Sequence, residues 1–569
     1  MFTRQKSQSP PPMATKIGKV NQVRFKAYDQ SQVIQVPIDV SSLIPSGHLV
    51  RIVDKAVEGL DMSVLEHYYC GGGCSAFHPK MLIKVWIYGY CERVYTSRRL
   101  CKAMRENVNF IWLSGNQHPC FKTLSEFRGE RMQAMIDLVF KQVLLLFVES
   151  GYIDIGDLYV DGSKWEANAN RYKRVWRANT ERYKLSVLER IELLLEEIKA
   201  LQREEDSEHG PGDLRELGKG DEVAVVLDSA AVNQHLVALQ ELVELEGAKQ
   251  RAANRSKIKG LTRLGSKLAK EQENLVKYEQ QEAVLGKRNS YSQTDTDATM
   301  LRMKDERLLP AYNVQHTTSN QYIVNYTIAQ NGSDSPTLPP HLDKMEARFE
   351  GVDKPKETSL GADAGYGSEE NYADLEGRGI EAYVKYPLWY QEVSAELVKK
   401  KFKRENWPYD TASDSYTCPN NRTLAFKEEA KRTSENGYEK TVRIYECKNC
   451  ENCPFAAECK KNEDKNRTVM HSEKGEAYKA RAKGLLDTAR GQEVRSNRSI
   501  EVESSFGDIK YNMKHDRFIL RGSNKVYVEY GLLSIGHNLR KVYCKESGIW
   551  AAYYAQRASK KGEKTLKRA

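Results

Sequence analysis

The order of short strands and helices along this chain constrains its fold more than any other feature. Continuously apolar or alternating segments predict strands, and apolar residues three and four apart predict helices. The predicted strands are 153–160, 311–314, 321–329, 359–362 and 380–384, and the helices among and after them are 344–349, 493–516 and 526–540. Strands and helices in this order form a sheet with helices packed against it. The sequence therefore predicts an α/β core interrupted by long insertions.

Two of the predicted strands end at an aspartate. Asp161 follows the apolar residues 158–160, Asp363 follows residues 360–362, and a glycine comes shortly after each aspartate. Buried strands deliver such carboxylates to the rim of a sheet, where α/β proteins place their functional sites. Two aspartates and a third carboxylate can hold two divalent cations about 3.5–4 Å apart, and Mg²⁺ prefers such oxygen ligands. Taken singly, either aspartate is more simply a turn or cap residue.

Residues 23–150 have the helical pattern of an N-terminal domain. One of its short helices carries four basic residues, Arg98, Arg99, Lys102 and Arg105. Such a helix face suits contacts with DNA phosphates, and a solvated charged face explains it equally well. The net charge of +10 favours a polyanionic partner only weakly, because acidic residues are abundant too.

Residues 175–290 repeat apolar side chains at the spacing of a coiled-coil seam. The seam positions are Leu188, Ile191, Leu195, Ile198, Leu236, Leu239, Val243, Leu261, Leu264, Leu268 and Leu275. With a turn at 209–212, this pattern predicts a helical insertion folded as an antiparallel coiled-coil hairpin or a bundle. It does not indicate whether the insertion contacts DNA, a second subunit or neither.

Five of the eleven cysteines lie in a polar insertion at 405–470. They are Cys418, Cys447, Cys450, Cys453 and Cys459. A structural zinc ion takes four ligands, and closely spaced cysteines on adjoining loops supply them. We therefore expect four of these five thiols to bind Zn²⁺. Reduced, unliganded thiols and an iron–sulfur cluster are the alternatives, and the spacing of the last cysteine fits the iron–sulfur motif poorly.

The two ends of the chain have the composition of tails. Residues 1–22 contain three consecutive prolines and no apolar signal segment, and residues 546–569 end in a basic run. The most apolar run, 139–148, is too short to cross a bilayer. These features predict a cytoplasmic protein that does not contact a membrane, a compartment in which clustered cysteines favour metal over disulfides.

Three stretches of the chain resemble, in order, the acidic blocks of the DDE transposases of bacterial insertion sequences. The first is DGSKWEANA from Asp161, the second ADAGYGSEEN from Ala362, and the third RSIEVESSFGDIK from Arg498. Residues 109–115, 290–304 and 312–315 are also similar, and the resemblance covers about residues 25–545. The branch it resembles most is insertion-sequence family eleven-eighty-two.

The resemblance implies a ribonuclease H-like catalytic core, dependence on Mg²⁺ (or Mn²⁺ in its place), and a nucleoid-associated protein that recognises terminal inverted repeats in double-stranded DNA. It also implies that Asp161, Asp363 and a glutamate of the third block hold the metal. Glu501 and Glu503 compete for that role, and about 200° separates them on a helix, so only one can face the sheet. Glu503 keeps the family spacing to Lys510, and we choose it.

Two basic residues of the third block were also considered. Lys510 lies two turns after Glu503 on nearly the same helix face, where it either contacts a substrate phosphate or is solvated. Arg498 is one residue out of register with an arginine of related transposases, and no suitable tyrosine precedes it. The DNA-end contacts made by those two family residues are therefore not carried over.

These features divide the chain into six regions. They are a flexible tail at 1–22, an all-α, DNA-binding domain at 23–150, the catalytic core at 151–174, 291–404 and 471–545, the coiled-coil insertion at 175–290, the cysteine-rich insertion at 405–470 and a basic tail at 546–569.

The leading hypothesis is a transposase that cleaves DNA at terminal inverted repeats and joins the 3′-hydroxyl ends to target DNA by two-metal phosphoryl transfer. The reaction requires two DNA ends, which implies a homodimer or a larger assembly on DNA. A catalytically inactive, DNA-binding regulatory relative is the alternative, and the intact set of three acids argues against it. A coiled-coil and zinc scaffold is a third hypothesis, and it leaves the strand-end aspartates unexplained.

Overall fold

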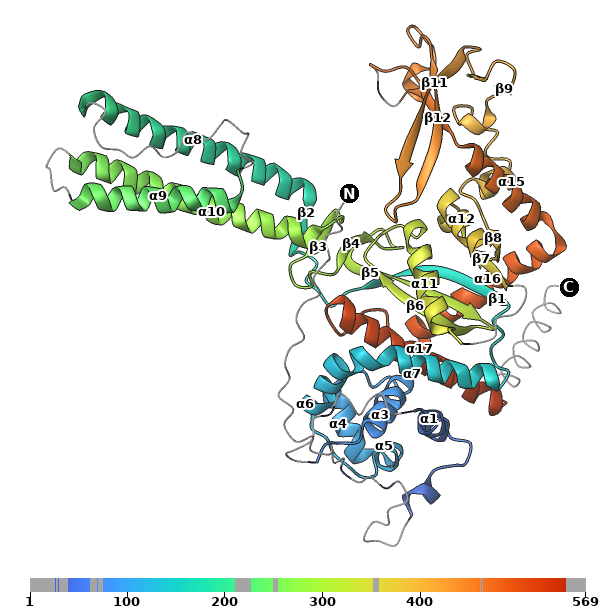
Figure 1. The fold of residues 1–569 in the computed structure, drawn as a ribbon. Helices are drawn as coiled ribbons and strands as arrows, with labels where there is room; N and C mark the ends of the chain where they lie inside the picture. The colour runs from blue at the N-terminus through green and yellow to red at the C-terminus, as the bar shows by residue number, and fades with distance from the viewer. Residues whose placement is uncertain are drawn as a thin grey trace, which may run out of the picture.

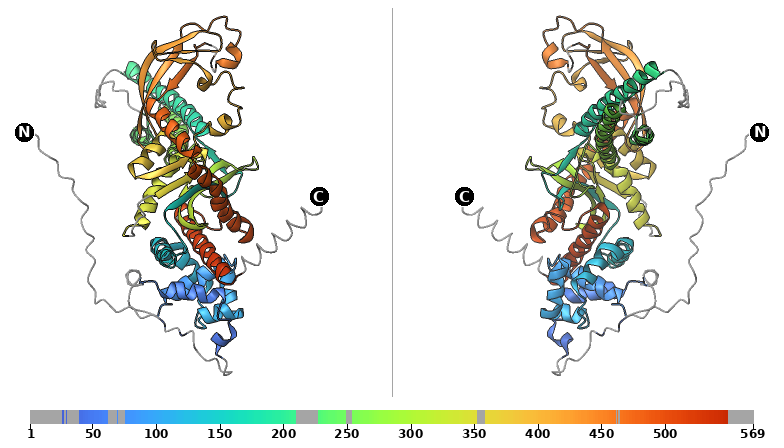
Figure 2. Two further views of the ribbon diagram at one scale, coloured as in Figure 1. Left: turned by 90° about the vertical axis from the view of Figure 1, so that its right-hand side faces the viewer. Right: turned by 90° about the vertical axis from the view of Figure 1, so that its left-hand side faces the viewer.

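The computed structural model describes residues 39–61, 75–209, 227–248, 254–351, 358–460 and 464–548, together with residues 26, 29, 69 and 462. It is a mixed α/β structure in which a helical N-terminal region packs against a mixed sheet. Two arms extend from the sheet, a helical one and a β-rich one (Figures 1 and 2). The predicted tail at 1–22, all but residues 546–548 of the predicted tail at 546–569, and most of the predicted turn at 209–212 lie outside the described residues.

The N-terminal region consists of short capped helices around one long apolar helix. They are α1 (Leu49–Glu58), α3 (Pro79–Cys91), α4 (Ser97–Glu106), α5 (Val108–Leu113), α6 (Phe121–Glu126) and α7 (Met132–Glu149). His48, His78 and Thr96 accept backbone N–H bonds at the starts of α1, α3 and α4, which satisfies donors that a helix start leaves free. The helical pattern predicted for residues 23–150 is confirmed over the part of this region that the structure describes.

The central sheet has six strands, which run in the order β4-β5-β1-β7-β8, with β6 also paired to β5. The strands are β1 (Asp157–Glu166), β4 (Thr299–Arg302), β5 (Leu308–Ser319), β6 (Tyr322–Ala329), β7 (Thr358–Ala362) and β8 (Ile380–Val384). β1 is antiparallel to β5 and parallel to β7, and β7 is parallel to β8. The strands predicted at 321–329, 359–362 and 380–384 are confirmed to within one residue, and the strand predicted at 311–314 is part of the longer β5.

The first strand differs from its prediction. β1 begins at Asp157 rather than at residue 153 and continues through Asp161 to Glu166. The extra length has a physical cause, because residues 159–166 pair with β5 along their whole length, and the register joins Asp161 to His316. Asp161 therefore lies within the strand, not at its end.

Helices cover both faces of this sheet. They are α11 (Leu338–Arg348), α12 (Glu369–Gly377), α13 (Trp389–Val393), α15 (Glu473–Asp487), α16 (Ala489–Gly507) and α17 (Ser523–Glu546). α16 contacts β1, β5 and β7, whereas α11 contacts β6 and α12 contacts β8. The helix predicted at 493–516 ends earlier, because residues 508–512 form a π-helical turn, η6.

His316 fixes α16 to the sheet. Its ring stacks on Phe506 with 3.6 Å between ring centroids, and its Nε2 lies 3.0 Å from the Ser505 hydroxyl. Its Nδ1 lies 3.0 Å from the Tyr530 hydroxyl of α17. Burial holds the pKa of His316 well below its usual value, so the ring is neutral. These contacts set the position of the helix that carries Glu501 and Glu503.

α17 lies between the sheet and the N-terminal helices (Figure 1), where it contacts β6 on one side and α3 and α7 on the other. Gly531 of α17 permits this close packing, since a Cβ there would lie 2.6 Å from a side-chain carbon of Ile136. Asp297 caps the start of α17, accepting the backbone N–H of Ser523 at 2.7 Å. The nearby Asp295 is buried against the Tyr312 hydroxyl.

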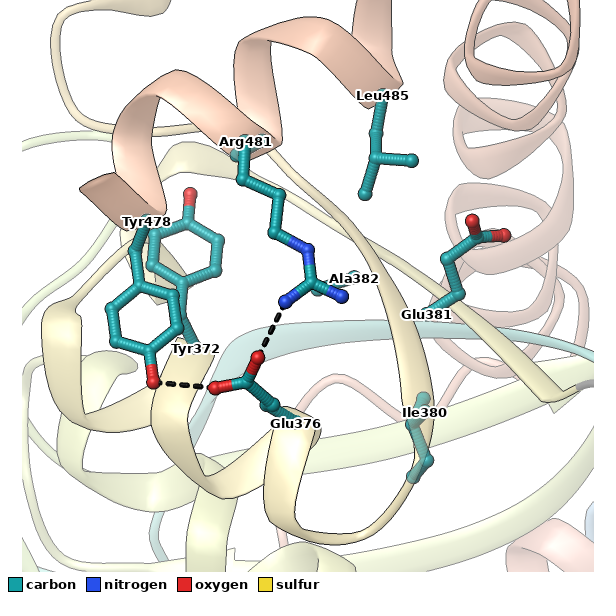
Figure 3. Close-up of a pocket in the computed structure, with 9 residues that line it drawn as sticks. Tyr372, Glu376, Ile380, Glu381, Ala382, Tyr478, Arg481 and Leu485 are labelled. Atoms are coloured by element: carbon teal, nitrogen blue, oxygen red, sulfur yellow. Dashed lines mark hydrogen bonds and ion pairs between the residues drawn. The ribbon is translucent and has the colours of Figure 1, made fainter. Parts of the chain in front are cut away.

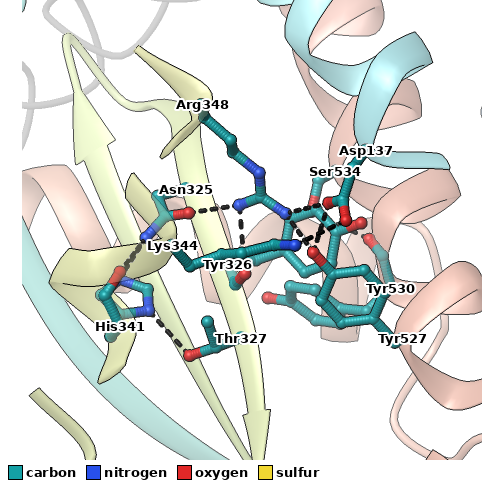
Figure 4. Close-up of polar contacts among 10 residues, drawn as sticks. All are labelled: Asp137, Asn325, Tyr326, Thr327, His341, Lys344, Arg348, Tyr527, Tyr530 and Ser534. Carbon is teal, nitrogen blue, oxygen red and sulfur yellow. Dashed lines mark hydrogen bonds and ion pairs between the residues drawn. The ribbon is translucent and has the colours of Figure 1, made fainter. Parts of the chain in front are cut away.

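Arg348 of α11 joins the N-terminal region to the sheet (Figure 4). Its buried guanidinium donates to Asp137 of α7 at 2.9 Å, to the Tyr326 carbonyl of β6 at 3.1 Å, and to Tyr527 of α17. Lys344 pairs with the same Asp137 carboxylate at 2.6 Å. Removing one partner of a buried ion pair costs more than the pair itself contributes, so this network holds α7, α11 and α17 in one arrangement.

The first arm is a bundle of three helices, α8 (Arg177–His209), α9 (Ser229–Ala248) and α10 (Asn254–Leu285). β2 (Arg174–Trp176) and β3 (Ser290–Ser292) pair at its base. The buried side chains form a separate apolar core that includes Ile191, Leu239, Leu261, Leu268 and Leu275. The predicted helical insertion is thus a bundle rather than a two-helix hairpin.

The second arm contains a five-stranded sheet in the order β13-β12-β11-β10-β9. Its elements are β9 (Tyr409–Asp410), β10 (Ser415–Thr417), β11 (Thr423–Thr433), β12 (Glu439–Cys447), α14 (Ala456–Cys459) and β13 (Thr468–His471). The turn of the β11–β12 hairpin reaches back to α12, where Tyr438 donates to Glu369 at 3.1 Å and Asn436 to Glu370 at 3.0 Å.

Among the described helices, none combines the length and the apolar content that a membrane span requires.

Candidate active site

The two predicted aspartates lie side by side at the rim of the sheet. The parallel pairing of β1 with β7 ends at Val160 and Ala362, and each of these residues is followed directly by an aspartate. The guanidinium of Arg498 on α16 lies between them, with its Nη2 3.0 Å from Asp161 Oδ2 and 3.8 Å from Asp363 Oδ2. Residues 161 and 363, about 200 positions apart in sequence, therefore share one cationic partner.

Asp161 and Asp363 are neighbouring acids whose carboxylates are partly shielded from solvent. Burial raises the pKa of Asp161 above its usual value, although Arg498 opposes the shift. The neighbouring carboxylates of Asp334 and Asp363 raise it further. Arg498 itself is 8% exposed, and its Nε has no hydrogen-bond partner among the residues that the structure describes. A carboxylate whose proton affinity is raised by neighbouring acids, and which shares one cation with one of them, has the electrostatics of a cation site.

Asp363 has two further neighbours that sequence reasoning missed. The Nζ of the buried Lys385 lies 3.7 Å from Asp363 Oδ1, and the Tyr390 hydroxyl lies 3.4 Å from the same oxygen. Lys385 follows β8 directly, and Tyr390 belongs to α13. Both therefore come from elements placed beside Asp363 by the pairing of β8 with β7.

The two glutamates of α16 point to different surroundings. Glu501 is half-buried and accepts the backbone N–H of Gln321 at the β5–β6 turn. Glu503 is exposed, although it lies close enough to Arg498 to contribute to the raised pKa of that guanidinium. The glutamate that contacts the sheet is therefore Glu501. The sequence-based choice of Glu503 as the third acid assumed that Glu503 would face the sheet. Within the described residues, no three acidic, histidine or cysteine side chains are arranged to hold a metal ion.

Asp334 is a fourth acid near the rim. It lies in the loop after β6, and its Oδ1 accepts the amide groups of Asn313 at 2.7 Å and Gln315 at 3.0 Å. Gly162, next to Asp161, makes room for it, because a Cβ at Gly162 would lie 2.5 Å from Asp334 Oδ1. No strand or motif marks Asp334 in the sequence, so it could be found only once β5 and β6 were placed beside β1.

A cleft of about 490 Å³ opens next to these acids. It is lined by Gly162, Ser163, Lys164, Arg302, Met303, Lys304, Asp305, Asn313, Asp334, Lys510 and Tyr511. Lys510 donates to the Ser163 hydroxyl at 2.6 Å and to the Lys164 carbonyl at 3.2 Å, with its Nζ 4.2 Å from the centre of the Trp165 ring. Burial lowers the pKa of Lys510 to about 8, and the neighbouring Lys304 adds to this effect. Lys510 is therefore a partly buried cation of the cleft wall, not a freely solvated one.

This shift predicts a pH dependence of DNA binding. Below about pH 8 Lys510 carries its charge in the free protein, and above that value it must take up a proton to offer the same charge to a phosphate. We expect the affinity for DNA to fall by up to about tenfold per pH unit as pH rises past this value. Lys510→Arg, which stays charged, should remove that fall when binding is titrated by fluorescence anisotropy. An equal fall in wild type and in Lys510→Arg would contradict this role.

The five cysteines gather at the far end of the β-rich arm. The backbone N–H of Arg422 donates to Cys418 Sγ at 3.4 Å, and that of Arg467 donates to Cys450 Sγ at 3.3 Å. Burial raises the pKa of Cys447 to about 11, and the neighbouring Cys450 adds to the shift. The other cysteines of the cluster likewise raise the pKa of Cys459, after burial. These thiols are thus close enough to repel one another when ionised, and they have the soft sulfur donors that Zn²⁺ prefers.

The predicted DNA-contacting residues of α4 are all exposed. They are Arg98, Arg99, Lys102 and Arg105. Arg98 lies over the Phe121 ring at 5.0 Å, and Lys102 pairs with Glu106 at 3.7 Å. The nearby Arg128, in the π-helical turn Phe127–Arg131, is buried and donates to the Tyr95 carbonyl at 2.6 Å, so it does not add to this exposed basic face.

A second, small cavity of about 40 Å³ lies between α12, β8 and α15 (Figure 3). Its polar groups are already paired, since Glu376 accepts from the Tyr478 hydroxyl at 2.7 Å and from Arg481. Most of the rest of its lining is aromatic and aliphatic, so we interpret the cavity as a packing defect between helix and sheet and do not assign it to the site.

Comparison with protein families gives two matches, both to transposase domains. The model described as "Transposase DDE domain" matches residues 417–543, from the end of β10 into α17, and so includes Glu503. The model described as "Transposase domain (DUF772)" matches residues 38–130, which contain helices α1, α3, α4, α5 and α6. Asp161 and Asp363 lie outside both matches. No curated protein and no solved structure matches the chain.

Proposed function

Because the chain belongs to the DDE transposases of insertion sequences, we propose that it cleaves DNA at the terminal inverted repeats of such an element and joins the freed 3′-hydroxyl ends to target DNA. The observation that carries this proposal is the convergence of Asp161 and Asp363 on the Arg498 guanidinium at the sheet rim. The basic cleft beside them supplies a path for the phosphate backbone.

The proposed catalytic core has a ribonuclease H-like fold. The strand order β6-β5-β1-β7-β8 supports it, with an antiparallel hairpin on one side of β1 and two parallel strands on the other. In this proposal the core is assembled from residues 151–174, 291–404 and 471–545. The helical region at 23–150 binds DNA, and the arms at 175–290 and 405–470 are insertions.

Asp161 and Asp363 would hold Mg²⁺, with Glu503 of α16 as the third acid. Their donor set fits, since both aspartates offer oxygen ligands and already share a cation. When bound, divalent metal makes an oxygen nucleophile more reactive and stabilises charge on the phosphate and the leaving oxygen. Mn²⁺ would serve in its place. The family's choice of acid favours Glu503, whereas the contact of Glu501 with Gln321 favours a positioning role for that residue.

The remaining steps depend on residues of this chain. Lys510 and Lys304 place a strand phosphate next to the aspartates, at the wall of the cleft. Arg498 counters the charge of the two carboxylates while no substrate is bound. The basic face of α4, formed by Arg98, Arg99, Lys102 and Arg105, contacts phosphates of the terminal repeat and fixes its register. Two DNA ends must be held together for joining, so we propose that the protein acts as a dimer or a larger assembly on DNA.

The cysteine cluster is proposed to be a structural zinc site. Four of Cys418, Cys447, Cys450, Cys453 and Cys459 would be the ligands, because bound Zn²⁺ relieves the repulsion among ionised thiols. We expect about one zinc per chain by atomic emission spectroscopy. Cys447→Ser and Cys450→Ser, which alter the two most buried thiols of the cluster, should lower the content to near zero. Cys544→Ser, outside the cluster, should leave it unchanged. A chain that contains iron instead, or no metal in any variant, would contradict this assignment.

The function is tested with a labelled duplex that ends in the element's own terminal repeat. Wild-type protein with Mg²⁺ should nick this duplex at the repeat end and transfer the strand to a second duplex. A duplex with a scrambled repeat, or a reaction with EDTA, should give neither product.

The second candidate function is that of a catalytically inactive, DNA-binding regulator. One observation favours it, namely the exposed position of Glu503 and the lack of three acids arranged around one ion within the described residues. Specific binding of the repeat duplex without nicking at any Mg²⁺ or Mn²⁺ concentration would support this second function.

A further inference from the structure

The cleft beside the aspartates is lined by two sets of side chains of different chemistry. One set, here called the rim cations, is Lys164, Lys304 and Lys510, and the other, here called the floor, is the acceptor groups of Asn313 and Asp334. The cleft begins one residue after Asp161, at Gly162 and Ser163. Any ligand in it therefore lies directly next to the proposed catalytic acids.

The rim cations are matched by few carboxylates. Lys164 and Lys510 donate to neutral oxygens. Lys164 donates to the Arg302 carbonyl, and Lys510 donates to the Ser163 hydroxyl and to the Lys164 carbonyl. The acid on the rim, Asp305, is already paired with Arg307 at 2.6 Å. Crowding of Lys304 against Lys510 helps to lower the pKa of Lys510. A phosphate would relieve this repulsion and satisfy the ammonium groups.

The floor presents hydrogen-bond acceptors. Asn313 is 1% exposed, and its Oδ1 has no hydrogen-bond partner among the described residues. Its Nδ2 donates to Asp334 Oδ1, which leaves the second carboxylate oxygen of Asp334 for another donor. A buried acceptor without a donor costs free energy, and a ligand that brings N–H groups would supply that donor.

An aromatic ring completes the cleft. Tyr511 follows Lys510 in η6, lines the cleft, and is 80% exposed. Burial of an aromatic ring is favourable, so a large exposed ring beside cations is typical of a surface on which a nucleic acid base stacks.

We propose that this cleft holds one unpaired nucleotide of the DNA strand that is processed at the acids. Its phosphate contacts Lys304 and Lys510, its base stacks on Tyr511, and an amino group of the base donates to Asn313 and Asp334. A space of about 490 Å³ is in the range of single small-ligand pockets, so it admits a nucleotide and excludes a duplex. The proposal rests on the proposed function and adds that the DNA end is locally unpaired in the complex.

The acceptor floor also gives a base preference. Adenine, cytosine and guanine each carry an exocyclic amino group with two N–H donors, whereas thymine offers only its single ring N–H. The proposed cleft therefore binds any of the first three bases better than thymine, and an abasic nucleotide least well.

The test compares DNA binding by the full chain, without divalent metal, to two duplexes that carry the terminal repeat. One is fully paired, and the other has a single unpaired nucleotide at the cleavage position. Wild type should bind the second at least about fivefold more tightly, the size of one stacking contact. Tyr511→Ala should lose this advantage, whereas Tyr172→Ala, which removes an equally exposed tyrosine (82%) outside the cleft lining, should keep it.

The base at the unpaired position is then varied. An advantage that falls from adenine to thymine to an abasic site in wild type, and that no longer depends on the base in Asp334→Asn, supports the acceptor floor. Equal binding of the two duplexes by wild type overturns the inference and leaves the proposed function intact. Failure of wild type to prefer the terminal repeat over a scrambled duplex overturns both.

Discussion

Asp363→Asn should lower the rate of DNA strand cleavage by at least about a thousandfold while the protein stays folded and still binds the terminal repeat. Asparagine has nearly the same shape but no charge, so it neither binds a divalent cation as aspartate does nor pairs with Arg498. Loss of a group that acts only in the transition state lowers the rate and leaves binding nearly unchanged. The measurement is a single-turnover nicking assay with a parallel binding titration, and Asp161→Asn should behave alike.

Asp343→Asn provides the matched control. Asp343 is a surface carboxylate that pairs with Arg378 and is remote in sequence from the three acidic blocks, so its loss should change the nicking rate little. Two further variants, Glu503→Gln and Glu501→Gln, test which of these glutamates is the third acid of the site. We expect Glu503→Gln to be as inactive as Asp363→Asn, and Glu501→Gln to retain cleavage with reduced stability. Cleavage by Asp363→Asn at the wild-type rate would remove this residue from the site.

Arg498→Gln should reduce the stability of the metal-free protein and make that stability depend on divalent cation. The guanidinium is almost fully buried and pairs with Asp161 and Asp363, so its loss leaves Asp161 without its cation and Asp363 with only Lys385 beside it. Breaking a buried pair costs about 3–5 kcal/mol, and the 39% exposure of the Asp363 side chain reduces the expected cost to about 2 kcal/mol. Thermal unfolding in EDTA should therefore begin at a lower temperature than in wild type.

Addition of Mg²⁺ or Ca²⁺ should restore most of this loss, because the metal takes the place of the missing charge. The rise in melting temperature on adding metal should be larger for Arg498→Gln than for wild type, where the guanidinium competes for the same carboxylates. Arg495→Gln is the control, since Arg495 lies on the same helix but packs over the Trp389 ring at 4.9 Å. A destabilised Arg498→Gln that does not respond to metal would show that the arginine is only a structural residue.

The sequence predicted the parts of the fold that depend on local pattern. The strands at 359–362 and 380–384 are short, apolar and bounded by turns, and they have those limits, within one residue, in the structure. β1 was predicted too early and too short because residues 162–166 mix glycine, charged and aromatic residues. Only the pairing with β5, about 150 residues later, makes them a strand. A partner so distant leaves no local signal.

The same distinction applies to the candidate site. Asp161 and Asp363 each follow an apolar segment, but they could be chosen only because the blocks around them resemble those of the DDE transposases. Arg498 was set aside for being one residue out of register, yet the helix turns its side chain toward both aspartates. Asp334 and Lys385 have no distinguishing neighbours in sequence, and both reach the site through strands whose order only the fold reveals.

The Arg348 network would determine the distance between the DNA sequence that the protein binds and the position at which it cleaves. It ties α7, which precedes the sheet in sequence, to α11 beneath the hairpin strands and to α17. In the proposed function, the helical region that binds the repeat and the carboxylates that cleave it are then held in one arrangement by these contacts. The fixed distance between the two parts would set the number of base pairs between the bound sequence and the cleavage site, and this number would be the same at every copy of the element.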